Sequence, residues 1–198
     1  MSLKGLLNLL VGHPAYRHIT EKDGLGQAAH GSDIAGGKPL LIASLWNDLQ
    51  LPTLVITPRP DSARRLYEQL SFYLGPESPI LLLPEPDILP FERLAVDAST
   101  NNQRLMALDA LSYASKNSPV LVIASLSAAL LKTLSTTTFT NCSHTFTVGQ
   151  KVRLSDLTSR WVTMGYRREE SVEIPGTFSI RGGIIDIFSP NSLLPARL

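Results

Sequence analysis

The chain has 198 residues, of which 43% are hydrophobic and 18% are charged, and its formal net charge is +1. A nearly neutral chain has no strong overall field that would by itself argue for binding to nucleic acid or to a membrane surface. Its single cysteine, Cys142, excludes a disulfide framework and a paired-cysteine metal site, and it fits a reducing compartment. Because no apolar run approaches the roughly 20 residues that span a bilayer, we expect a cytoplasmic protein with no membrane partner.

The opening stretch MSLKGLLNLLVGHP predicts a short amphipathic helix rather than a signal peptide. One face of this helix carries four leucines: Leu3, Leu6, Leu7 and Leu10. We expect Gly12 to cap the helix and Pro14 to stop it.

From about residue 38 the sequence alternates between helix and strand patterns. Apolar side chains spaced three and four apart predict three helices, which start near Lys38, at Asp61 and at Thr100. Asp61 and Thr100 are the expected N-caps of the second and third helices. Three short apolar runs predict buried strands: 53–57, 80–83 and 120–124. Apolar strands separated by amphipathic helices indicate an α/β fold, a parallel sheet with helices on both faces.

After residue 125 the pattern changes to that of a small α+β domain. A short helix at 128–134 leads into a threonine-rich stretch, 135–150, whose composition is typical of strands and turns. We therefore expect two domains, 1–126 and 127–198.

The second of these domains carries one helix and one hairpin signal. Ser155 is expected to cap a helix that ends at Gly165. Its inward residues are Leu157, Trp161 and Met164. Two β-rich runs flank Gly182-Gly183, which predicts a β-hairpin with a two-residue turn at positive φ.

The segment GSDIAGGKPLLIASL, residues 31–45, resembles a phosphate-binding loop that runs into a helix. A working loop reads G-x-x-x-x-G-K-[S/T], of which only Gly37 and Lys38 are present. Ser32 replaces the first glycine, and Pro39 replaces the hydroxyl residue that binds magnesium and also removes a backbone N–H. We interpret the segment as the relic of a nucleotide-binding fold that holds no cofactor. A working nucleotide site is the alternative.

Other polar residues give weaker signals for catalysis or metal binding. The four histidines show no metal-ligand spacing. Glu85, Asp87 and Glu92 lie between prolines in a loop, where carboxylates are more often solvated or capping than catalytic. Ser125 and Ser127 lack the G-x-S-x-G surroundings of a serine nucleophile.

The hairpin and the segment before it carry a basic cluster: Arg167, Arg168 and Arg181. Side chains alternate along a strand, so Arg181 falls on the side opposite Phe178 and is expected to point outward at the turn. Such an arginine is either an interface residue, whose planar fork holds carboxylates, or a solvated side chain. In the second case it pairs with a glutamate at position 169, 170 or 173, and spacing alone favours this reading.

Longer stretches of the chain resemble a known family. GTFSIRGGIIDIFSP, preceded by VGQKVRLSDLTSRWVTMGYRREESVEIP, closely resembles the second domain of UvrB and of the bacterial transcription-repair coupling factors (Mfd). GGKPLLIASLWNDLQLPTLVITPRPDSARRLYEQLSFYL and SPVLVIASLSAAL resemble the first domain of the same proteins. The incomplete phosphate loop and LLLPEPDILPFERLAVDASTNNQRLMALDAL are closer to the coupling factors, since UvrB keeps an intact loop. The resemblance covers about residues 25–198.

The resemblance implies the N-terminal fragment of a longer coupling factor. This fragment is expected to be non-catalytic and to dock UvrA through its second domain, which recruits nucleotide excision repair to stalled RNA polymerase. It also implies that ATP, magnesium, RNA polymerase and DNA are bound by motor and polymerase-binding domains outside this chain. An ATP-hydrolysing UvrB-like helicase fragment is the alternative, and a DNA-binding module is a third possibility that the net charge disfavours.

The resemblance also implies which residues bind UvrA. Carried over by motif, the contacts fall on Arg167, Arg181 and Phe188. With the family in view, a contact becomes the favoured reading of Arg181. Phe188 could equally be a core residue, and the register of the hairpin decides between a contact and a core position.

Overall fold

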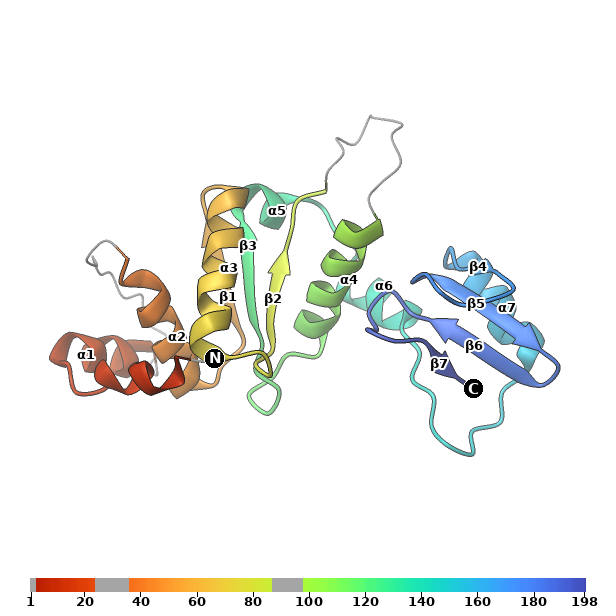
Figure 1. Ribbon diagram of the computed structural model, residues 1–198, viewed down its shortest axis with the longest axis horizontal. Coiled ribbons are helices and arrows are strands. Elements are labelled where there is room, and N and C mark those ends of the chain that lie inside the picture. Colours follow the sequence, from red (N-terminus) through yellow and green to blue (C-terminus); the bar gives the residue numbers. More distant parts are fainter. Residues whose placement is uncertain (1–2, 24–35, 87–97) are drawn as a thin grey trace.

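The structure of the protein is a computed structural model that describes residues 3–23, 36–86 and 98–198. Within these ranges the chain forms one three-stranded sheet and one four-stranded sheet. Figure 1 shows the two sheets next to each other along the long axis of the molecule. The strands of the first sheet are β1 (Thr53–Thr57), β2 (Ile80–Leu83) and β3 (Leu121–Ser125).

The first sheet is parallel throughout and has the strand order β1-β3-β2. Ile123 of β3 is paired with Val55 of β1 on one side and with Leu82 of β2 on the other. Every residue of β3 is buried, which explains why its first four residues, 121–124, are all apolar. All three strands predicted from the sequence are confirmed, the third with a shift of one residue.

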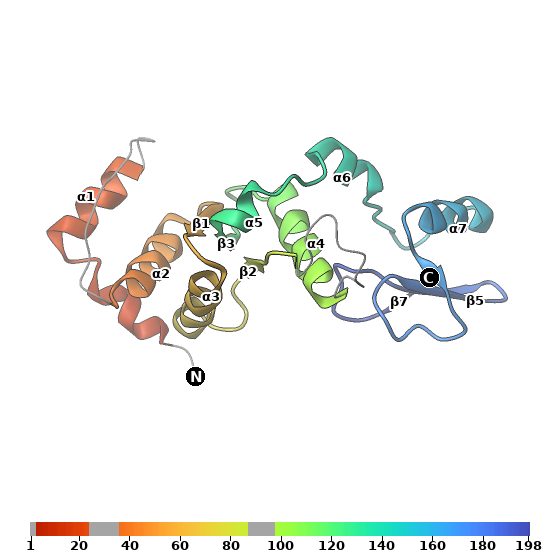
Figure 2. The same cartoon turned by 90° about the horizontal axis from the view of Figure 1, so that it is seen from above.

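Helices cover both faces of this sheet, as the sequence predicts. They are α2 (Lys38–Leu49), α3 (Pro60–Leu74) and α4 (Ala98–Ser112). α3 lies on one face with α2 beside it, and α4 lies on the opposite face (Figures 1 and 2). The chain crosses β3 in one direction through α3 and returns in the other direction through α4. Because such crossovers are right-handed, the two helices must lie on opposite faces.

Each face of the first sheet has its own apolar core. Ala43, Leu70 and Ile123 are fully buried between α2, α3 and the sheet. Ala107 and Val122 are fully buried between α4 and the sheet. The inner face that the spacing predicts for α3 is confirmed, because Ala63, Leu66, Tyr67, Leu70 and Leu74 all lie in this core. The face predicted for α2 is only partly right: Trp46 is in the core, whereas the stacked leucines Leu41, Leu45 and Leu49 are not buried.

The N-caps predicted for three helices are wrong. α3 begins at Pro60, whose fixed φ suits a first helical position, so Asp61 lies inside the first turn. α4 begins before Thr100, and α7 (Leu154–Thr163) begins one residue before Ser155. The predicted capping side chains therefore lie within the first turns of these helices.

The N-terminal segment forms a 3-10 helix, η1 (Lys4–Leu9), and then α1 (Pro14–Asp23). Leu7 is buried in the core of α2 and α3, whereas the other leucines of the predicted apolar face are not buried. Pro14 starts α1 instead of only ending the previous helix, because its missing N–H is no loss in a first turn. The Tyr16 hydroxyl donates a hydrogen bond to Asp48 Oδ2 at 2.5 Å and so links α1 to α2. Burial is the main cause that raises the pKa of Tyr16, and the bond to Asp48 is the next.

The region after β3 contains two short helices, α5 (Leu126–Leu130) and α6 (Thr136–Cys142). The strand-and-turn prediction for 135–150 is wrong at α6, where Ser135 caps the helix by accepting from the Thr138 N–H at 3.1 Å. A local N-cap here outweighs the strand preference of threonine. The domain boundary between residues 126 and 127 stays a prediction. In the described ranges, no helix combines the length and the apolar character needed to cross a membrane.

The second sheet has the order β4-β5-β6-β7. Its strands are β4 (Arg167–Arg168), β5 (Thr177–Arg181), β6 (Ile184–Phe188) and β7 (Ala196–Arg197). β4 is parallel to β5, and the other neighbours are antiparallel. The predicted hairpin is confirmed: Gly182 and Gly183 join β5 to β6. Gly182 has φ +63° but Gly183 lies outside the positive-φ region, so positive φ is confirmed for the first glycine only.

α7 covers one face of the second sheet. Its Leu157 and Trp161 pack with apolar side chains of the hairpin: Phe178, Ile185 and Ile187. The rings of Trp161 and Phe178 have centroids 5.4 Å apart. Both residues are almost fully buried, and Gly165, at φ +94°, follows the helix as predicted. The inward positions predicted for this helix are confirmed.

We predict that Phe178→Ala lowers the free energy of unfolding by about 3–5 kcal/mol, because it removes an aromatic ring from a closed core. Urea unfolding followed by Trp161 fluorescence, in a Trp46→Phe background, measures this loss. Phe72→Ala is the matched control, since Phe72 is 63% exposed on α3 and should cost less than about 0.5 kcal/mol. Equal losses in the two variants would contradict the placement of Phe178 in the core.

Candidate functional site

The candidate site is the face of the second sheet that points away from α7. Phe178 and Ile180 of β5 point toward α7, so the alternate residues of this strand belong to the opposite side. Strand pairing extends that side across the sheet. We call it the outer face; it consists of Arg167, Thr177, Ser179, Arg181, Ile184, Asp186, Phe188 and Arg197.

All three residues that the resemblance assigns to UvrA binding lie on the outer face. Arg167 and Phe188 are paired with Thr177 from its two sides, and Arg181 ends the same strand. Arg167 and Arg181 are exposed, whereas Phe188 is half-buried. The register answers the question left open for Phe188: Phe178 is paired with Ile187, so Phe188 lies on the side away from the Trp161 core. Their contact with UvrA stays a prediction.

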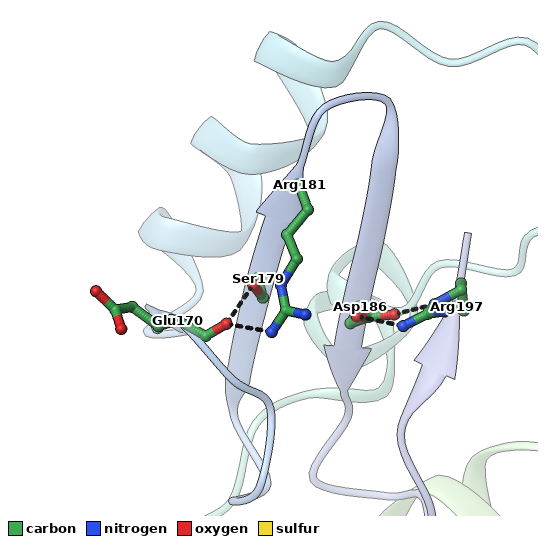
Figure 3. Close-up of polar contacts among 5 residues, drawn as sticks. All are labelled: Glu170, Ser179, Arg181, Asp186 and Arg197. Carbon is green, nitrogen blue, oxygen red and sulfur yellow. Dashed lines mark hydrogen bonds and ion pairs between the residues drawn. The ribbon is translucent and has the colours of Figure 1, made fainter.

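Arg181 is bound to a backbone carbonyl. Its Nη2 donates to the Glu170 carbonyl at 2.7 Å, and the Ser179 hydroxyl donates to the same oxygen at 3.0 Å (Figure 3). In the described part of the chain its guanidinium forms no ion pair, so the predicted pairing with a nearby glutamate is not formed. A neutral acceptor fixes the side chain without neutralising its charge. The exposed cation is therefore held in place and still able to bind an anion.

The loop that joins β4 to β5, residues 169–176, covers part of the outer face. Its start is fixed by the Glu169 N–H, which donates to the Phe178 carbonyl at 2.9 Å. Thr177 Oγ1 donates to the Ile174 carbonyl at 2.6 Å. Thr177 and Ser179 are only 1% and 2% exposed, although both are polar. Buried hydroxyls need partners, and the carbonyls of this loop supply them.

A second arginine of the outer face is neutralised. Arg197 donates from Nε and Nη2 to the two carboxylate oxygens of Asp186, at 2.6 and 2.9 Å (Figure 3). These hydrogen bonds are the largest influence on the pKa of Asp186 and hold it below its ordinary value. Lost hydration opposes them, and the charges of Arg197 and then of Arg181 lower the pKa further. Sequence reasoning missed this pair, because it depends on the register of β6 and β7.

The Gly37-Lys38-Pro39 part of the incomplete phosphate-loop motif lies at the start of α2. Gly37 is the N-cap of that helix, Lys38 its first residue, and Pro39 is buried in its first turn. Ser32, where the sequence departs from the first glycine of the motif, lies outside the described residues. A proline in the first turn offers no N–H to a phosphate. The relic interpretation stays a prediction.

The other polar candidates have structural partners or lie outside the described ranges. Ser125 Oγ donates to Glu85 Oε1 at 2.8 Å and accepts from the Ala128 N–H at 3.1 Å, which makes it the N-cap of α5. Asp87 and Glu92 lie outside the described residues. Where the structure is described, no three histidine, cysteine or acidic residues are close enough to hold a metal ion.

Comparison with known proteins identifies the class of this module. Residues 145–198 match the family described as the UvrB interaction domain. This range contains α7, the whole second sheet and therefore the outer face.

Whole-chain relatives agree with this match. The chain is 33% identical to the transcription-repair-coupling factor of Myxococcus xanthus over 163 residues, which cover 80% of this chain and 13% of the relative. It is 30% identical to that of Mycobacterium bovis over 199 residues, 99% of this chain and 16% of the relative. It is 24% identical to the UvrABC system protein B of Fervidobacterium nodosum over 161 residues, 77% of this chain and 24% of that protein.

These matches confirm the resemblance to the UvrB-like module of transcription-repair coupling factors, and they relate the chain to nucleotide excision repair proteins. The chain spans only 13 to 16% of the length of the coupling factors from Myxococcus xanthus and Mycobacterium bovis.

We predict that the stabilising effect of the Asp186–Arg197 pair is lost in acid. The folded-state pKa of Asp186 lies below the unfolded value of about 4, so the pair stabilises fully above that value. The stabilisation then falls as the pH drops through the lowered pKa. An NMR titration of the Asp186 carboxyl carbon should show a midpoint below the ordinary value.

The control for this titration is Arg197→Gln, which removes the main cause of the shift. We expect the Asp186 midpoint to return to its ordinary value or slightly above it, because the remaining effect of lost hydration raises the pKa and outweighs the charge of Arg181, which lowers it. An unchanged midpoint in this variant would contradict the bidentate pair.

Proposed function

We propose that this chain is the N-terminal, non-catalytic docking module of a transcription-repair coupling factor and that its outer face binds UvrA. In the whole protein the module would recruit nucleotide excision repair, in the cytoplasm, to RNA polymerase stalled at DNA lesions. ATP-driven movement on DNA and polymerase binding would belong to other domains of that protein.

The observation that carries this proposal is the state of Arg181 in a UvrB interaction domain. The guanidinium is exposed, oriented by one carbonyl, and forms no ion pair with a carboxylate among the described residues, since Asp186 is paired with Arg197. Its remaining N–H groups can hold a carboxylate of a protein partner in a bidentate geometry. Arginine residues of this kind are enriched among the energetically dominant residues of protein interfaces.

The charges around Arg181 favour a protein partner over DNA. Residues 167–173 place two arginines beside three glutamates, and the sequence reads RREESVE. DNA, a polyanion, is attracted by the arginines but repelled by the glutamates. A protein surface can present both signs of charge and so complement both kinds of residue. The near-neutral net charge points the same way.

The start of α2 supports a module without ATPase activity. Phosphate binding at a helix N-terminus uses the free N–H groups of the first turn, and Pro39 removes one of them. It also stands where the hydroxyl that binds magnesium is required. We therefore propose that the phosphate loop is degenerate and that this chain binds neither ATP nor magnesium.

The first test is a calorimetric titration of the chain with purified UvrA. We expect saturable binding that Arg181→Ala weakens by about 1–3 kcal/mol. Arg65→Ala is the matched control, because Arg65 is an exposed arginine on α3, away from the outer face, and should bind like the unaltered chain. If the folded chain does not bind UvrA, or if both variants bind equally, the proposed docking through Arg181 is wrong.

The second test separates the docking module from the ATP-hydrolysing alternative. We expect the midpoint of thermal unfolding to stay unchanged when MgATP is added. A working site at 100 times its dissociation constant would add about 2.7 kcal/mol and raise the midpoint by several degrees. A rise that Lys38→Ala abolishes would establish the alternative.

A further inference from the structure

The Glu170 carbonyl accepts two hydrogen bonds from two very different donors. Ser179 Oγ lies 3.0 Å from this oxygen and Arg181 Nη2 lies 2.7 Å from it (Figure 3). A carbonyl oxygen has two lone pairs, so both bonds can form together. The two donors are two residues apart on the same strand and therefore reach the carbonyl from the same face.

The two bonds differ in their exposure to water. Ser179 is 2% exposed, so water has little access to its hydroxyl, and the loop carbonyl is the partner that keeps it satisfied. Arg181 is exposed, so water competes with the carbonyl for its N–H groups. The Glu169 N–H bond fixes the start of the loop, and the buried Ser179 bond then holds the Glu170 carbonyl itself. Arg181 therefore binds an acceptor that is already in place.

We propose that Ser179 is a positioning residue of the docking face: by holding the Glu170 carbonyl, it orients the Arg181 guanidinium for its partner. This inference rests on the proposed function and adds a residue that does not itself meet UvrA. Thr177 supports the same loop farther on, through its bond to the Ile174 carbonyl.

The arrangement lowers the cost of docking. An arginine that is free in solution loses side-chain entropy when it binds, and an arginine that is already oriented loses less. Loss of the Ser179 hydroxyl should therefore weaken UvrA binding by roughly two- to tenfold, the range expected for one immobilised side chain. The effect must pass through Arg181.

The first measurement uses the free chain. Amide hydrogen exchange of residues 169–176 should be faster in Ser179→Ala, because the loop loses its buried anchor. Arg181→Ala should leave this exchange nearly unchanged, since its bond is exposed. Ser155→Ala, the same substitution on α7 and on the other side of the sheet, is the matched control. Equal exchange in Ser179→Ala and Ser155→Ala would overturn the proposal.

The second measurement is a double-mutant cycle for UvrA affinity. Ser179→Ala should weaken binding in the unaltered chain and have no further effect in the Arg181→Ala background. An additive loss would overturn the positioning role, because Ser179 would then act independently of Arg181. If Ser179→Ala does not fold, Ser179→Cys replaces it, since a thiol has a similar shape and is a weaker donor.

The two measurements separate this inference from the proposed function. If the unaltered chain does not bind UvrA, the proposed function fails and the positioning role for UvrA fails with it, while hydrogen exchange still reports the Ser179 anchor. If the unaltered chain binds UvrA and Ser179→Ala binds equally well, docking stands and the positioning role is overturned.

Discussion

The second sheet depends on the fact that β5 is covered on both sides. Phe178 and Ile180 face α7, and Thr177 and Ser179 face the loop of residues 169–176. A slip of one residue would move the two apolar side chains out of the core and turn Arg181 toward α7. The register that fills the core is therefore the register that presents Arg181 on the outer face, so packing and the candidate site are set together.

The two bound arginines of the outer face show how the acceptor decides what an arginine can do. Arg197 binds a carboxylate through two N–H groups, and the charges of this pair cancel. Arg181 binds a carbonyl, which orients the guanidinium but leaves its charge available. An exposed ion pair contributes little to stability, so Arg197 mainly links β7 to β6. Arg181 keeps the capacity to bind an anionic partner group.

The packing of the first sheet does not depend on the loop at the start of α2. Its layers depend on apolar side chains such as Leu70, Val122 and Ile123, which pack on the two faces of the sheet. None of these contacts uses the side chain of Lys38 or requires a hydroxyl at position 39. A change of side chain at Lys38 would therefore leave the core intact, and function must be argued from the site and not from the architecture.

The sequence by itself determined the local elements with strong periodicity: the three parallel strands, the inner face of α3, the hairpin at Gly182, and the outward direction of Arg181. It failed at α6, where the Ser135 cap outweighed threonine propensity, and at the N-caps. Only the tertiary structure decided that Arg181 binds the Glu170 carbonyl, that Asp186 pairs with Arg197, and that Phe188 lies outside the Trp161 core. Periodicity is a local property, whereas these partners are brought together by strand register and by the path of one loop.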